Sequence, residues 1–157
     1  MTRTETLHSS TTIPERIESV LDALGGFPLS ILQFLLRLSI AAVFWHSGMT
    51  KVASWDTTIA LFRDEYMVPI LPPEIAASLA VIAELTCPVL LVMGLATRLA
   101  TLPMLGMTFV IEVFVYPEQW IEHLMWASIL VFILTRGPGA LSLDHLIARR
   151  LLRGRNG

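Results

Sequence analysis

Four long apolar stretches with very few charges dominate the pattern of residues along the chain. At about 1.5 Å per residue the first is roughly 33 Å long, close to the thickness of a bilayer core of about 30 Å. Each stretch must be helical, because lipid cannot satisfy exposed backbone polar groups and the alternation of barrel strands is missing. The pattern therefore predicts an all-α integral membrane protein, a four-helix transmembrane bundle. We place the four spans at residues 29–50, 73–96, 99–116 and 121–135, within a domain of residues 29–136.

The segments outside the spans are amphipathic or basic. In residues 1–28, apolar side chains from Ile13 to Leu24 recur at helical spacing opposite acidic ones, which predicts a short helix on the membrane surface or against the bundle. Residues 51–72 have Ile59, Phe62 and Tyr66 on one helical face and predict an amphipathic lid over the bundle. Residues 137–157 are expected to form a basic tail with a final helix over 143–152.

Composition agrees with a membrane protein. Of the 157 residues, 54% are hydrophobic and only 15% are charged, and the charges are clustered between the apolar stretches. The net charge of −2 indicates no nucleic-acid partner. The single cysteine, Cys87, rules out an intrachain disulfide and a CxxC redox motif.

The positive charges predict the orientation. Four spans place both termini on the same side of the membrane, and cytoplasmic loops carry an excess of Lys and Arg. The opposite side would hold only Lys51 and Arg63. Both termini are therefore expected to be cytoplasmic. Their side would hold Arg3, Arg16, Arg98, Arg136, Arg149, Arg150, Arg153 and Arg155.

Glu84 is the most unusual residue of the second span. A carboxylate at bilayer depth is costly, and it marks a candidate functional site. Pro88 follows four positions later and removes the hydrogen bond to the Glu84 carbonyl. Counting residues from the span ends puts Arg37 roughly 12 Å deep from the inner side and Glu84 roughly 16 Å deep from the outer side. We therefore expect an intramembrane ion pair between Arg37 and Glu84. The alternative is that Arg37 snorkels toward the inner surface and Glu84 is protonated.

A second polar group is expected nearer the outer rim. His46, Glu112 and His123 fall within roughly 6 Å of one level, and Lys51 lies at the rim above them. The four side chains predict a ligand-binding pocket. A quinone headgroup would suit it, because His and Glu supply a donor and a proton acceptor. Polar residues that merely join the helices are the plainer alternative.

A metal site is a further alternative for the same region, and no metal is assigned. Copper or zinc needs several His, Glu or sulfur ligands. The nearest candidates are His46, Met49, Glu112 and His123. The common hydrolase, metalloprotease, P-loop and Rossmann motifs do not occur in the sequence, so no catalytic residue is assigned.

Several motifs resemble the DoxX family over residues 30–148. They are Leu36-Arg37-Leu38, the run from Phe44 to Lys51, the run from Ala80 to Leu85, the run from Leu91 to Arg98, and the closing run from Gly137 to Asp144. The resemblance implies a four-helix protein of the bacterial inner membrane. By position, Arg37, Lys51, Glu84 and Arg98 match polar positions of the family pattern. Thr86-Cys87-Pro88 departs from it, because the family often has small residues there.

The resemblance also implies a link to redox chemistry. Family members are associated with a thiosulfate:quinone oxidoreductase, with oxidative-stress complexes and with copper-related modified peptides. The first functional hypothesis is accordingly a membrane subunit that binds a quinone or similar redox lipid and works with a partner protein in a redox or stress-response complex. A scaffold or anchor without chemistry is the second, and copper handling or small-solute transport is the third. Homo-oligomers stay open, because small residues on the second span permit close helix approach.

Overall fold

The computed structural model describes residues 13–67 and 70–154. Within them the chain is helical, with no strand and seven α-helices. These are α1 (Ile13–Gly25), α2 (Leu29–Ala53), α3 (Trp55–Leu61), α4 (Pro73–Met93), α5 (Thr97–Val110), α6 (Trp120–Arg136) and α7 (Leu143–Gly154). Short helical turns join them, namely η1 (Phe62–Tyr66) and η2 (Ile111–Val115), which are π-helical, and η3 (Pro117–Gln119), which is 3₁₀. The predicted all-α class is confirmed. Residues 1–12, Arg155 and the side chain of Arg153 lie outside what the structure describes.

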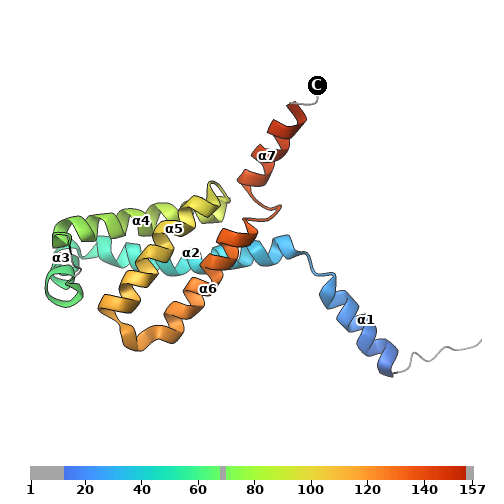
Figure 1. Cartoon of the computed structure of the whole chain (residues 1–157), viewed down its shortest axis with the longest axis horizontal. Coiled ribbons are helices and arrows are strands. Elements are labelled where there is room, and N and C mark those ends of the chain that lie inside the picture. Colours follow the sequence, from blue (N-terminus) through green and yellow to red (C-terminus); the bar gives the residue numbers. More distant parts are fainter. Residues whose placement is uncertain (1–12, 68–69, 155–157) are drawn as a thin grey trace, which may run out of the picture.

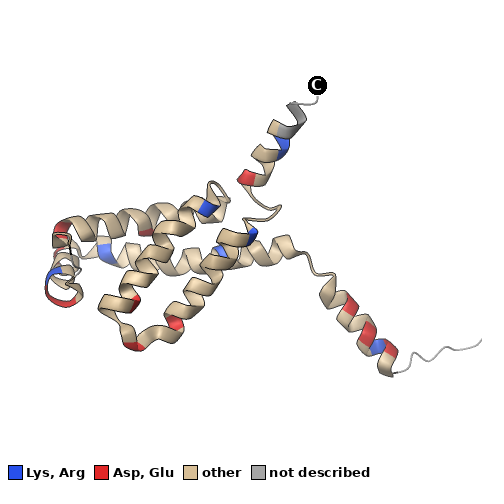
Figure 2. Cartoon of the chain, in the orientation of Figure 1, with Lys and Arg blue, Asp and Glu red and all other residues tan. Residues whose placement is uncertain are grey.

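Four of the helices pack into one bundle (Figure 1). Helix α2 contacts α4 along much of its length and also contacts α6, while α5 lies against both α4 and α6. Helices α1 and α7 leave the bundle in different directions, and α1 buries no side chain. The charged residues gather at the ends of the bundle and on α1 and α7, with few along its middle (Figure 2).

Three helical segments are long and apolar enough to cross a membrane. They are Leu29–Ala53, Pro73–Met93 and Thr97–Val115, so the chain is a multi-pass membrane protein. The first runs three residues beyond its predicted end at Thr50, whereas the second stops at Met93 rather than Ala96. The early stop follows from Gly94, whose φ of +68° ends the helix in the left-handed conformation. Helix α6 has 17 residues, so a fourth crossing is a proposal taken up below.

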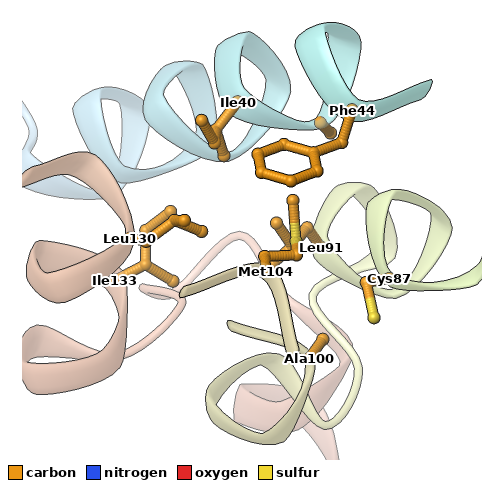
Figure 3. Packing of buried hydrophobic residues seen from close by; sticks show 9 residues of the cluster. Ile40, Phe44, Cys87, Leu91, Ala100, Met104, Leu130 and Ile133 are labelled. Atoms are coloured by element: carbon orange, nitrogen blue, oxygen red, sulfur yellow. The ribbon is translucent and has the colours of Figure 1, made fainter. Parts of the chain in front are cut away.

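The centre of the bundle is a cluster of apolar side chains from α2, α4, α5 and α6 (Figure 3). Because lipid tails are as apolar as these side chains, burial alone does not drive the helices together, and close packing and hydrogen bonds must do so. Phe44 contributes a tilted ring contact with Trp126 at 5.8 Å between centroids. The buried members are Ile40, Ala41, Phe44, Cys87, Leu91, Ala100, Met104, Leu130 and Ile133.

A buried arginine closes one end of the bundle. Arg37 of α2 is fully buried, and its guanidinium donates hydrogen bonds to the carbonyls of Leu91, 3.2 Å away, and Leu141. It thereby joins α2 to the end of α4 and to the loop that precedes α7. A Cβ at Gly94 would lie 2.2 Å from Arg37 Nη1 and 2.4 Å from the Cβ of Ser142, so this position requires glycine both for space and for its positive φ.

Asp144 completes this end by capping α5. Its two carboxylate oxygens accept hydrogen bonds from the amides of Ala96, at 2.8 Å, and Thr97, at 3.0 Å, while its own amide donates to the Gly94 carbonyl. Burial raises the pKa of the Asp144 carboxyl, but these amide hydrogen bonds and the charge of Arg37 outweigh it and hold the pKa below its ordinary value. We call Arg37, Gly94, Ser142 and Asp144 the arginine lock.

Asp144→Asn should destabilise the protein by about 1 kcal/mol at neutral pH, because an amide leaves one of the two capped N–H groups without its charged acceptor. The folded carboxyl has the lower pKa, so its contribution is present above the unfolded pKa of about 3.9 and is lost as pH falls through the folded pKa. Unfolding midpoints of both proteins in detergent should therefore converge at acid pH. A constant difference across the pH range would contradict the role of the charge.

Candidate functional site: a polar cluster in a membrane-level cavity

The site is built on an unusually close approach of α2 and α4. A Cβ added at Gly48 would lie 2.9 Å from Leu85 Cδ2 and 3.0 Å from Glu84 Cβ. Glycine at this position therefore lets the two helices touch at the level of Glu84. The neighbours of Gly48 on α2, Ser47 and Lys51, come within hydrogen-bond reach of the carboxylate as a result.

Three polar side chains meet there. Lys51 Nζ lies 2.8 Å from Glu84 Oε1 and 2.7 Å from Ser47 Oγ, and Ser47 Oγ donates to Glu84 Oε1 at 3.1 Å. Only 2% of the Glu84 side chain is exposed, against 16% for Lys51. Helical side chains lean toward the N-terminus of their helix, so Lys51 reaches back one turn to Ser47 and down to the carboxylate. We call these three residues the Lys51 cluster.

The predicted ion pair between Arg37 and Glu84 is wrong. Glu84 pairs with Lys51, whereas Arg37 bonds to backbone carbonyls. Arg37 is level with Leu91, which follows Glu84 by two helical turns, or about 10 Å along α4. Counting depth from the span ends missed this, because such a count ignores helix rotation and the reach of the lysine side chain.

The Lys51 cluster opens onto a cavity of about 440 Å³ between α2, α4, α5 and α6. Its wall is mostly apolar and includes Phe44, Met107 and Trp126. The polar side chains lie at a few points, with Ser47, Lys51, Glu84, Tyr66, Tyr116, Gln119, Glu122 and His123 among them. Ligand pockets in proteins have this size and this mixture of an apolar wall with few polar groups.

A second polar pair lies beside the cavity. His123 Nδ1 is 2.6 Å from Glu112 Oε2, joining α6 to the turn η2. His123 is buried and also packs edge-on against Trp126 at 5.2 Å, while 34% of the Glu112 side chain is exposed. Of the four side chains predicted to form the pocket, the cavity therefore contains Lys51 and His123, and Glu112 joins through His123.

His46 does not join them. Its side chain is exposed on α2, and so is that of Met49 one turn later, so neither reaches the cavity or the Glu112–His123 pair. The helical twist explains this, because Ser47 and Lys51 occupy the inward face and adjacent residues point elsewhere. In the described residues no three His, Cys, Asp or Glu side chains come together, and the four metal candidates do not share a site.

Within the predicted lid over residues 51–72, the structure has the helix α3 and the π-helical turn η1. Phe62 and Tyr66 line the cavity and stack edge-on at 5.0 Å. Tyr66 also packs against Tyr116, and the Tyr116 hydroxyl donates to Glu65 Oε1 at 2.5 Å. This hydrogen bond raises the pKa of the Tyr116 phenol above its ordinary value. The contact ties the lid to the turn between α5 and α6.

Comparison with protein-family models matches residues 32–117 to the DoxX model. The chain belongs to the DoxX family. The matched DoxX segment contains Arg37, Lys51, Glu84 and Arg98. The loop with Leu141 and Ser142, and Asp144 in the first turn of α7, follow it. No curated protein and no solved structure matches the chain.

Two features of the DoxX site were missed by the sequence reasoning. Ser47 was overlooked, although it lies four residues before Lys51 and therefore on the same helical face. Lys51 was assigned to the rim of the pocket rather than to Glu84. Gly48 was the residue that could have revealed both contacts with Glu84, because a small residue inside an apolar span marks a close helix contact.

Gly48→Ala should separate α2 from α4 and lower stability by about 1–3 kcal/mol, because the new methyl group would meet Leu85 and Glu84. Gly106→Ala is the matched control, since nothing lies within 4 Å of a Cβ there. Thermal unfolding in detergent should show a lower midpoint only for the first variant. Equal midpoints for both variants would refute the close contact.

Lys51→Met should cost about 3–5 kcal/mol, because it leaves the buried Glu84 carboxylate without its cation. The double variant Lys51→Met/Glu84→Gln should recover much of that loss. Arg63→Met is the control, since it breaks an exposed pair with Glu74 and should leave the unfolding midpoint almost unchanged. If the double variant is no more stable than Lys51→Met, the burial of an unpaired charge is not the cause of the stability loss.

Proposed function

We propose that the protein is a redox-associated membrane subunit that binds a quinone or a similar redox lipid in the cavity beside the Lys51 cluster. The observation that carries the proposal is the cavity of about 440 Å³, with an apolar wall and an ammonium group at one end. Membership in the DoxX family supports the membrane setting of this cavity.

The size and wall of the cavity suit a flat, mainly apolar headgroup. Phe44, Trp126 and Tyr66 supply aromatic surface, and Met107 supplies a side chain that adapts its shape. A solute that carries a net charge would meet few compensating groups on this wall. The cavity therefore favours an uncharged ring over an ion.

The polar groups suit carbonyl or hydroxyl oxygens on such a ring. The Lys51 ammonium has three N–H donors, of which Ser47 and Glu84 take two, so one remains for a ligand oxygen. His123 uses Nδ1 in its contact with Glu112, which leaves Nε2 for a second oxygen. The residues that would hold the ligand are thus Lys51 and His123.

When bound, a quinone would supply two-electron chemistry coupled to proton uptake. The chain's part would be to orient the ring and to handle protons. His123 can hold a proton at a ring nitrogen and exchange it with the partly exposed Glu112 carboxylate 2.6 Å away. The Tyr66 and Phe62 rings of the lid would limit the access of water.

The same proposal includes four membrane crossings, with residues 29–136 as the membrane domain and α6 as the fourth span. Helix α6, extended by η3, reaches about 30 Å, which is sufficient for a crossing. It also includes the bacterial inner membrane, cytoplasmic termini and a partner protein that exchanges electrons with the ligand. Support for the orientation comes from four arginines, Arg98 where α5 begins, Arg136 where α6 ends, and Arg149 and Arg150 on α7.

Titration of the purified full chain with a short-tail ubiquinone tests the proposal. Binding should quench tryptophan fluorescence and raise the unfolding midpoint. Ala80→Phe fills the cavity and should abolish both effects, whereas Ser128→Phe, on an exposed face of α6, should leave both unchanged.

Lys51→Gln gives a second comparison, since it keeps a donor but removes the charge. It should weaken binding without blocking the cavity. If the wild-type protein shows no saturable binding, or if Ala80→Phe binds as well as Ser128→Phe, the quinone proposal is wrong. The scaffold function would then account better for the chain.

A further inference from the structure

We propose that the phosphate of an anionic phospholipid binds in a second cavity, where α5 begins and α6 ends. This cavity has a volume of about 490 Å³ and lies at the arginine-lock end of the bundle. Its lining includes Arg98, Arg136, Gly137, Asp144 and His145. It shares no lining residue with the cavity beside the Lys51 cluster.

The charges of this second cavity favour an anion. Arg98, in the first turn of α5, and Arg136, the last residue of α6, both have exposed side chains that line it. Arg98 Nη2 lies 3.5 Å from the Thr135 carbonyl and 3.5 Å from the site of a Cβ at Gly137, so the guanidinium is held over the end of α6. Two guanidinium groups at one cavity are the usual recognition element for phosphate.

The negative charge of Asp144 in the lining does not cancel the positive charges of Arg98 and Arg136. Asp144 has both carboxylate oxygens occupied by the amides of Ala96 and Thr97, and its charge also faces Arg37. The next two amides of α5, those of Arg98 and Leu99, have no intrahelical acceptor and lie at the positive end of the helix. They add to the attraction for an anion.

Apolar surface beside the cavity indicates a lipid rather than a free ion. Leu99 is 69% exposed and Leu102 is 50% exposed, and the two lie on one face of α5 that leads from the cavity along the bundle. Acyl chains can follow this face while the phosphate contacts the arginines. Helix α7 supports a membrane surface at this level, because its exposed Leu143, Leu146 and Ile147 share one helical face.

Native mass spectrometry of the full chain tests the site. The probes are dioleoyl phosphatidylglycerol and dioleoyl phosphatidylcholine in mixed detergent micelles. Wild-type protein should retain phosphatidylglycerol preferentially. Arg98→Gln/Arg136→Gln should weaken that retention about 30-fold, since two cationic contacts are lost.

Two further variants keep the result interpretable. Arg149→Gln/Arg150→Gln removes the same charge from α7 and should change retention less than about threefold. Arg98→Lys/Arg136→Lys keeps the charge and should retain the lipid. Loss of phosphatidylglycerol preference in the α7 variant equal to that in Arg98→Gln/Arg136→Gln would overturn the site. So would retention by Arg98→Gln/Arg136→Gln at the wild-type level.

Competition with inorganic phosphate distinguishes a site for a lipid phosphate from a site for a free phosphate ion. At equal concentration it should not displace phosphatidylglycerol, because it lacks the acyl chains that contact Leu99 and Leu102. Displacement by inorganic phosphate would show a free-anion site and would overturn the lipid assignment.

Discussion

The fold depends on how the charge of one buried guanidinium is compensated. Arg37 has no exposed surface, and a bare charge at membrane depth is strongly unfavourable. Its compensation comes from the carbonyls of Leu91 and Leu141 and from the charge of Asp144. Leu91 lies in the last turn of α4, where its carbonyl also accepts the Gly94 amide at 3.1 Å and the helix dipole attracts a cation. One side chain therefore joins α2, α4 and the segment that begins α7.

Such a lock explains why the two ends of the bundle differ. At the lock end, Asp144 and Arg37 use backbone groups from three chain segments, which leaves little freedom for the helix ends to separate. At the other end, contacts between side chains join the helices, namely the Lys51–Glu84, Arg63–Glu74 and Glu112–His123 pairs and the Tyr116–Glu65 hydrogen bond. The cavity beside the Lys51 cluster lies at this end.

The helices and the polar residues of the site could be predicted from the sequence, but their pairing could not. Apolar length places the spans to within a few residues, because lipid leaves the backbone no alternative to a helix. Pairing depends on helix rotation and on side-chain reach, which a depth count ignores. Glu84 thus has Lys51 rather than Arg37 as its partner, and His46 is turned away from the pocket one residue before Ser47. The role of Leu91 was also hidden, because a carbonyl acceptor leaves no trace in residue type.

The two π-helical turns lie at the end of the bundle that holds the cavity beside the Lys51 cluster, and not at the end that holds the arginine lock. Both η1 and η2 line the cavity, through residues that include Phe62 and Val115. A π turn adds a residue to the helical repeat, which displaces the following side chains, and such turns occur frequently at functional sites. Here they place Glu112 beside His123 and Tyr66 beside Tyr116. The π-helical turns thus lie at the end of the bundle where the polar groups need positions that a regular helix would not provide.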